Sequence, residues 1–320
     1  MLTRRSILAA GLLAPVAARA QTMPTTMRII NPFPPGGSSD SVARLLQPGL
    51  QQRLGASIIV ENRPGASASI GANVVAKSPP DGSTWLLAAD TFVVSSLLMK
   101  ELPYDVQKDF IPVTMVARGA MVLCTPASRP YRTLADVIAA AKAAPDTLTY
   151  ATTGVGSNGH LTTAALCQIT GAKMVHVPYR GAAPAANDAI AGHVDLFISS
   201  TASLAALIES GQLRAIVQCG ETRAPFLRDT PTAMESGIAN FHAYSWFGFF
   251  APAATPKPII DRFYRDVVAT AREPANTDIL VNKFRVEVPL PTPEELRTTI
   301  AEELPFWSKI ITDNNIKGGG

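Results

Sequence analysis

A proline- and glycine-rich turn, residues 31–40 with the sequence NPFPPGGSSD, constrains the fold of this chain more than any other segment. It follows a short β-like run at residues 27–30 and precedes an apolar helical pattern over residues 42–54. Gly36 and Gly37 permit positive φ angles and let a ligand reach backbone N–H groups without meeting a Cβ atom. The segment therefore predicts a strand, a stiff turn and an amphipathic helix.

The start of that helix is expected to attract an anion. Ser38 or Ser39 can cap it, with Asp40 in or beside the first turn. The first N–H groups of a helix have no partner inside the helix, and its dipole favours negative charge there. We expect this turn to form half of a carboxylate-binding clamp.

Residues 1–20 have the pattern of a secretory signal peptide. Arg4 and Arg5 precede an apolar run at residues 7–16, and residues 18–20 offer a small-residue cleavage site. The run is too short to span a membrane. The arginine pair followed by Ser6 also fits a twin-arginine signal, although such pairs occur in ordinary signals too. We expect a periplasmic protein exported by a cleaved N-terminal signal.

Charge and cysteine content exclude several classes of function. The whole chain has a formal net charge of +3, from 28 basic and 25 acidic residues. Removing the leader and its three arginines leaves 25 of each, so no bulk attraction to nucleic acid is expected. Cys124, Cys167 and Cys219 lie far apart without metal-ligand spacing, so we expect neither a metal nor a cofactor.

Strand and helix patterns alternate along the mature chain, which indicates an α/β fold. Its length of about 300 residues exceeds the usual size of one hydrophobic core, so two domains are expected. In the first part, strands are expected at 57–61 and 84–88, a short helix at 70–77, and one or two β segments at 111–124, interrupted by Gly119.

A second unit is expected from about residue 125. Its first helix should begin with a capping box at Thr133 and Asp136. Further strands are expected at 148–152, 174–177, 194–199 and 213–219, and further helices at 161–169, 184–191 and 203–210. Two final helices are expected to pack back on the first unit, one opened by Thr255 and Pro256 and the other by a capping box at Thr292 and Glu295.

A second glycine-rich turn, residues 153–159, repeats the strand–turn–helix order. Its letters match GxGxxG, but no acidic residue ends the next strand, as a dinucleotide site would require. Ser157 with His160 nearby raises the alternative of an exported serine hydrolase, although Val155 replaces the first glycine of GxSxG. Because ligands bind beyond the carboxyl ends of parallel strands, both turns should face one cleft.

Several ordered motifs resemble one known family over essentially the whole mature chain. They are residues 32–40 (PFPPGGSSD), 60–66 (VENRPGA), 79–82 (PPDG), 102–105 (LPYD), 108–110 (KDF), 156–161 (GSNGHL), 177–181 (VPYRG) and 192–195 (GHVD). These motifs resemble the substrate-binding proteins of tripartite tricarboxylate transporters, the Bug periplasmic receptors.

The resemblance implies an α/β, two-lobed periplasmic binding protein of type II-like architecture. Each lobe would be a mainly parallel sheet flanked by helices, with the ligand cleft between the lobes. Residues 28–124 plus 239–320 would form lobe 1, and residues 125–238 lobe 2. The protein would be a monomer without catalytic activity, delivering a small carboxylate to membrane permease subunits of a tripartite transporter. A sensory ligand-binding subunit is a further alternative.

The resemblance also implies a set of ligand-binding residues. They are Phe33, Pro35, Gly36, Gly37, Ser38, Ala89, Asp90, Thr91, Thr153, Gly154, Ser157, Asn158, Tyr179, Arg180, Gly181 and Asp195. Two of them depart from the family pattern. Asp90 stands where small or hydroxyl residues are common, and inside the cleft it would repel an anion or favour an amine or a neutral ligand. Arg180 is often lysine, and it would favour a second carboxylate only if it pointed inward.

Overall fold

The computed structural model describes residues 23–99 and 101–318, so the expected signal peptide lies outside the described residues. Within those residues, no helix combines the length and apolar character needed to cross a membrane. All three cysteines are free thiols, with Cys124 and Cys219 buried.

The first part of the chain alternates strands and helices as expected. Its elements are β1 (Thr26–Asn31), α1 (Ser38–Leu54), β2 (Ser57–Asn62), a 3₁₀ turn (Ala66–Ala68), α2 (Ser69–Ala76), β3 (Thr84–Ala89) and α3 (Asp90–Leu98). β1 pairs in parallel with β2 on one side and β3 on the other. Every residue of β3 is buried, as expected for a strand covered on both faces.

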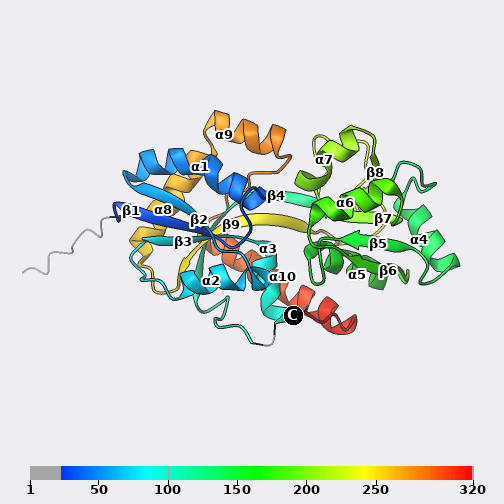
Figure 1. Ribbon diagram of the computed structural model, residues 1–320, viewed down its shortest axis with the longest axis horizontal. Coiled ribbons are helices and arrows are strands. Elements are labelled where there is room, and N and C mark those ends of the chain that lie inside the picture. Colours follow the sequence, from blue (N-terminus) through cyan, green and yellow to red (C-terminus); the bar gives the residue numbers. More distant parts are fainter. Residues whose placement is uncertain (1–22, 100, 319–320) are drawn as a thin grey trace, which may run out of the picture.

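One long strand, β4 (Phe110–Pro126), connects the two halves of the molecule (Figure 1). Up to Ala120 it pairs antiparallel with β9 (Tyr244–Pro252), which also pairs with β3. From Met121 onward it pairs with β7 (Leu196–Ser200) and β8 (Leu213–Gln218). The expected interruption at Gly119 is wrong, because this residue pairs with Ser245 inside the strand. A Cβ there would collide with Thr201, which accounts for the glycine.

The second part repeats the arrangement around another parallel core of strands. Its elements are α4 (Leu134–Ala143), β5 (Thr149–Thr152), α5 (Asn158–Thr170), β6 (Val175–Pro178), α6 (Ala182–Ala191), β7, α7 (Thr201–Glu209) and β8. β5 pairs in parallel with β6 and β7. The strand order is β2-β1-β3-β9-β4-β7-β5-β6, with β8 on β4, and the antiparallel β4 and β9 make both regions mixed sheets.

The closing segment comprises α8 (Lys257–Ala271), α9 (Pro274–Asp278), a π-helical turn (Ile279–Lys283) and α10 (Pro293–Asp313). α8 packs on the first sheet as expected, where Phe263 stacks on Trp85 with ring centroids 3.6 Å apart. The expectation for the last helix is wrong in part. Leu296 and Ile300 of α10 join the core of the first sheet, whereas Trp307 and Ile310 join the core of the second.

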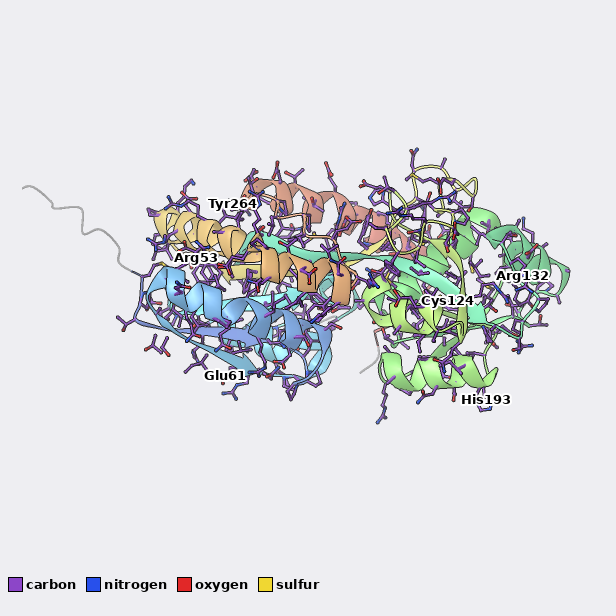
Figure 2. All side chains as sticks on the ribbon, turned by 90° about the horizontal axis from the view of Figure 1, so that it is seen from above. Arg53, Glu61, Cys124, Arg132, His193 and Tyr264 are labelled. Atoms are coloured by element: carbon purple, nitrogen blue, oxygen red, sulfur yellow. The ribbon has the colours of Figure 1, made fainter. Side chains whose placement is uncertain are left out.

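Each sheet region is covered by helices on both faces. α1 and α8 cover one face of the first, and α2, α3 and α10 the other. The capping boxes at Thr133 and Thr292 both form as expected. Figure 2 shows the molecule as two parts side by side, with Arg53, Glu61 and Tyr264 in the first and Arg132 and His193 in the second.

Candidate functional site

The turns that follow the parallel strands meet in a pocket of about 500 Å³. The first sheet contributes the β1–α1 and β3–α3 turns, and the second sheet contributes the β5–α5 and β7–α7 turns. The carboxyl ends of parallel strands are the usual ligand position in such sheets. The pocket is lined by Phe33, Pro34, Pro35, Gly36, Gly37, Ser38, Ser39, Ala89, Asp90, Thr91, Met121, Thr153, Asn158, Gly159, Ile198, Ser199, Ser200, Ser203, Ser245 and Phe247.

The β1–α1 turn leaves the start of α1 open towards this pocket. The N-cap residue is Gly37, and no side chain caps the helix. The expectation that Ser38 or Ser39 caps α1 is therefore wrong. Both are already helical, and the Ser39 hydroxyl donates to Asn31 Oδ1 at 2.9 Å. The N–H groups of the first turn thus remain available for a ligand.

Asp40 stabilises the turn instead of blocking it. Its carboxylate accepts hydrogen bonds from Gly36 N at 3.0 Å, Arg44 Nε at 2.9 Å and Asn62 Nδ2 at 3.0 Å. These bonds, that of Arg44 above all, lower the Asp40 pKa to about 2. The side chain is ionised near neutral pH, and the adjacent guanidinium offsets its charge. Gly36 adopts a φ of 81°, which explains a glycine at this bend.

The β5–α5 turn is organised by its own side chains. Ser157 is the N-cap of α5, and its hydroxyl donates to Gly154 O at 2.8 Å and accepts from His160 N at 3.4 Å. Gly154 and Ser157 line an adjoining hollow of about 330 Å³ that shares Phe33, Thr91 and Thr153 with the pocket. Both predicted residues therefore lie next to the pocket but not in its wall.

His160 does not form a base–nucleophile pair with Ser157. Its Nδ1 accepts a hydrogen bond from Gly156 N at 3.1 Å, and its ring stacks on His176 with centroids 3.7 Å apart. Burial lowers the pKa of each imidazole to about 4. The two neutral rings support the turn. Sequence alone did not indicate this stacking, because His176 lies on a different strand, β6.

Asp90 lies in the wall of the pocket and is only 4% exposed. Its Oδ2 accepts from Asn158 Nδ2 at 2.7 Å, and its Oδ1 accepts from Ser245 Oγ at 3.0 Å. Asn158 also donates to Tyr244 O at 2.8 Å. This network joins the start of α3 to the start of α5 and to β9. Burial raises the pKa of Asp90 against the opposing effect of these donors.

Besides Gly154 and Ser157, four predicted residues do not line the pocket: Tyr179, Arg180, Gly181 and Asp195. The Tyr179 hydroxyl donates to Asp188 Oδ2 at 2.7 Å, Arg180 is exposed, and Gly181 is the N-cap of α6. This segment lies beside the β5–α5 turn. The Tyr179 carbonyl oxygen is 3.6 Å from the position that a Cβ atom would take on Gly154.

Asp195 is at the opposite end of its sheet. Its carboxylate accepts from Thr149 N and Oγ1 at 2.9 and 2.8 Å and pairs with Arg129 at 2.8 Å. Thr149 begins β5 and Asp195 immediately precedes β7, so this group fastens the amino ends of two parallel strands. The expectation that Asp195 lies near the ligand is therefore wrong, because the pocket is at the other end of these strands.

Sequence reasoning missed the contribution of the β7–α7 turn. Ser199, Ser200 and Ser203 line the pocket with Ser245 of β9. The signal was present, because Ser199 ends the strand expected at 194–199 and Ser200 and Ser203 follow it. The rule that ligands bind beyond the carboxyl ends of parallel strands applies to this strand too.

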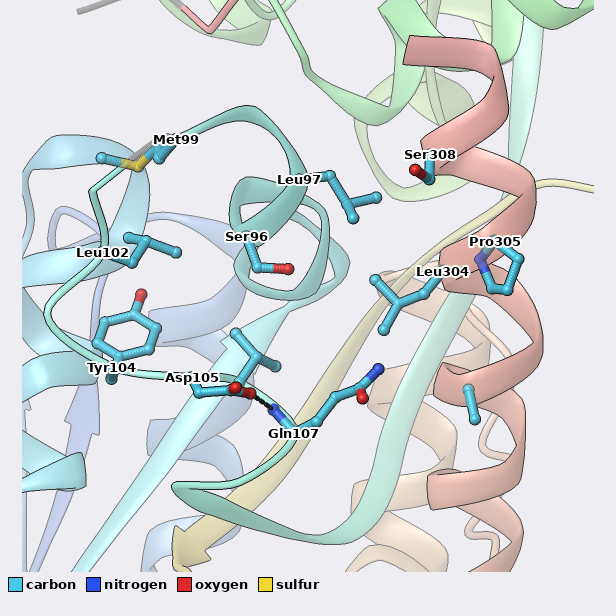
Figure 3. Close-up of a pocket in the computed structure, with 12 residues that line it drawn as sticks. Ser96, Leu97, Met99, Leu102, Tyr104, Asp105, Gln107, Leu304, Pro305 and Ser308 are labelled. Carbon is cyan, nitrogen blue, oxygen red and sulfur yellow. Dashed lines mark hydrogen bonds between the residues drawn. The ribbon is translucent and has the colours of Figure 1, made fainter. Parts of the chain in front are cut away.

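A second hollow, of about 530 Å³, lies between α3, the segment 102–107 and α10 (Figure 3). Tyr104, Leu102 and Leu304 lie in its wall, and the Asp105 carboxylate accepts from Gln107 N at 3.0 Å. The lining shares no residue with the pocket above and includes none of the strand-end turns. We therefore place the candidate site at the strand ends.

Two mixed sheets joined by β4 and β9, with a pocket at the ends of their parallel strands, define a two-lobed periplasmic solute-binding protein. The profile of the tripartite tricarboxylate transporter family receptor matches residues 42–316. The chain is 35% identical to protein BugT of Bordetella pertussis over 317 residues, covering 97% of this chain and 95% of BugT. It belongs to the tripartite tricarboxylate transporter receptor family.

Solved structures agree with this assignment. R. palustris Rpa4515 with adipate has a TM-score of 0.81 and 31% identity, covering 91% of this chain and 98% of that one. MatC from Rhodopseudomonas palustris with bound malate has a TM-score of 0.77 and 28% identity, covering 89% and 98%. The family and these neighbours are substrate-binding receptors and not enzymes, so the hydrolase alternative is wrong.

Proposed function

We propose that the protein binds a small carboxylate in the pocket between its two lobes and delivers it to a membrane permease. The observation that carries this proposal is the uncapped start of α1 at Gly37, which presents backbone N–H groups to the pocket. Rpa4515 with adipate and MatC with bound malate support a carboxylate as the ligand. The permease subunits are the partner that the family description implies.

The ligand carboxylate would bind to the turn from Phe33 to Ser38. The Ala89–Thr91 and Thr153–Asn158 turns would complete the pocket, with Tyr179, Arg180 and Gly181 at its edge. A carboxylate can accept several charge-assisted hydrogen bonds, each contributing about 1.5–3 kcal/mol. The first-turn dipole of a helix adds roughly 0.3–1 kcal/mol when exposed and more when shielded from water.

Ligand closure would take place at the strands that connect the lobes. We propose lobe 1 as residues 28–124 plus 239–320 and lobe 2 as residues 125–238, with the C-terminal half of α10 packed on lobe 2. β4 and β9 run between them, and Asn158 already bonds across to Asp90 and to Tyr244. A ligand that contacts both lobes would favour the closed arrangement, as in other hinged binding proteins. The mature protein would be a periplasmic monomer, exported by the signal at residues 1–20.

A thermal-shift screen of organic acids, amino acids and aromatic acids tests the proposal, with isothermal titration calorimetry of the hits. A ligand at 100 times its dissociation constant stabilises the native state by about 2.7 kcal/mol. The expected result is saturable binding of one carboxylate per chain, with the ligand recovered unchanged. Stabilisation by no carboxylate, or chemical conversion of a bound one, would contradict the proposed function.

A further inference from the structure

Among the described residues that line the pocket, one side chain is ionisable, and it is the carboxyl group of Asp90. None of these residues is lysine, arginine or histidine. The remaining side chains that could reach a ligand are hydroxyls, an amide and apolar groups. Arg180, the cation that could have matched a second carboxylate, is exposed and outside the lining.

We infer that this pocket selects an amino carboxylate, with the carboxylate at the start of α1 and the ammonium group beside Asp90, and that Asp90 disfavours dicarboxylates. The inference rests on the proposed function, because it assumes that the turn at Gly37 holds the first carboxylate. It adds the chemical class of the ligand and names the residue that determines it.

Among the described residues, no cationic side chain forms a hydrogen bond or ion pair with Asp90. Its donors are the amide of Asn158, the hydroxyl of Ser245 and, at 3.4 Å, the backbone N–H of Trp246. Glu302 and Glu303 of α10 and His242 line an adjoining hollow together with Asp90. Burial and Asp90 itself raise the pKa of Glu303. A second ligand carboxylate would add negative charge to a desolvated acidic region, whereas an ammonium would neutralise it.

Asp90 retains acceptor capacity for such a ligand. A carboxylate offers about four lone-pair sites, and the three donors above occupy three of them. Burial favours the protonated form of Asp90 and raises its pKa. A neighbouring cation has the opposite effect and would favour the ionised form. Ser199, Ser200 and Ser203 in the same pocket provide hydroxyl oxygens that can accept the other protons of an ammonium group.

A purely structural role for Asp90 makes a different prediction. Its bonds to Asn158 and Ser245 hold α3, α5 and β9 together, so loss of these bonds alone would weaken every ligand by a similar factor. A direct electrostatic role changes the order of affinities, because the ammonium and the carboxylate respond to the Asp90 charge with opposite sign. The ratio of affinities therefore separates the two roles.

The test is calorimetric titration of ligands matched in length: succinate, succinamate and 4-aminobutyrate, then adipate and 6-aminohexanoate. In the wild-type protein the amino acid of each length should bind at least tenfold more tightly than the dicarboxylate. Asp90→Asn should reduce or reverse that ratio by tenfold or more, since the amide keeps the size of the side chain but not its charge. The matched control Asp195→Asn makes the same change at the opposite end of the second sheet, outside the pocket, so it should leave the ratio unchanged.

The outcomes distinguish this inference from the proposed function. If any acid of the series binds but the amino carboxylates do not bind most tightly, the inference is wrong and the receptor function stands. An unchanged ratio in Asp90→Asn also overturns it. If no acid binds here or in the wider screen, the proposed function itself fails. The wild-type ranking remains decisive even if Asp90→Asn does not fold.

Discussion

Replacing Gly37 with valine should abolish ligand binding while leaving the protein folded. Gly37 has φ −75° and ψ 172°, an extended conformation that valine readily adopts. A Cβ at this position would lie 3.5 Å from Pro34 O, an ordinary contact, with no other atom within 4 Å. The Cβ atom therefore fits the protein, and the side chain that it carries would occupy space in the pocket wall, next to the N–H groups proposed to hold the carboxylate.

The expected effects on binding and on stability differ in size. Losing two charge-assisted hydrogen bonds at about 1.5–3 kcal/mol each reduces affinity at least 100-fold, because tenfold corresponds to about 1.4 kcal/mol. Stability should fall by only about 0.5–1 kcal/mol, since valine is a poorer N-cap than glycine. Calorimetric titration measures the first quantity and urea denaturation the second.

Gly36→Ala serves as the contrasting variant. Gly36 has φ 81° and no atom within 4 Å of an added Cβ, so alanine there is strained without filling space. Gly36→Ala should lower the unfolding free energy by about 1–2 kcal/mol. It should reduce the affinity for the ligand by less than Gly37→Val does. If Gly37→Val folds and retains wild-type affinity, the β1–α1 turn does not hold the ligand, and the reasoning is refuted.

Three further changes test groups around the pocket. Burial, followed by the charge of Asp90, raises the Glu303 pKa from 4.5 to about 7. Between those values the native state binds more protons than the unfolded chain, so stability falls as pH rises from 4.5 to 7. Glu303→Gln should therefore add up to about 3 kcal/mol to the unfolding free energy at pH 8 and little at pH 4, in urea denaturation; an equal effect at both pH values would contradict the assignment. Burial lowers the pKa values of His160 and His176 from 6.5 to about 4. Between these values the unfolded chain binds more protons than the native state, so the stability of the native state falls as pH falls from 6.5 to 4. His176→Gln should flatten that part of the wild-type pH profile, and an unaltered slope would disprove the effect. Ser157→Ala should lower the unfolding free energy by about 1 kcal/mol through loss of the α5 cap. Neither the wild-type protein nor the variant should hydrolyse esters. If the wild-type protein did so and the variant did not, the hydrolase alternative would be restored.

Local patterns predicted the elements whose signals lie within a few residues. The capping boxes at Thr133 and Thr292 and the turns after β1 and β5 could be located because cap, glycine and periodicity signals are short-range. The helix α3 was not expected, since its β-branched residues have low helix propensity. Phe92 packs against Phe110 and Phe250 from β4 and β9, and that tertiary burial outweighs the local preference.

Long-range contacts account for the remaining differences in the site. Asp195 could not be separated from the ligand-facing residues by sequence, because its partners Thr149 and Arg129 are distant in the chain. Likewise, the orientation of Asp90 depends on Asn158 and Ser245, which belong to other elements. Sequence located the strand ends, and the three-dimensional arrangement decided which side chains share the pocket.

The most direct test of a carboxylate receptor is a crystal structure of the protein with a carboxylate identified in the thermal-shift screen. The proposal predicts a carboxylate oxygen about 2.7–2.9 Å from a backbone N–H at the start of α1, or linked to it through one water, with the ligand in contact with both lobes. A saturating ligand whose carboxylate lies elsewhere, for example in the hollow between α3 and α10, would contradict it.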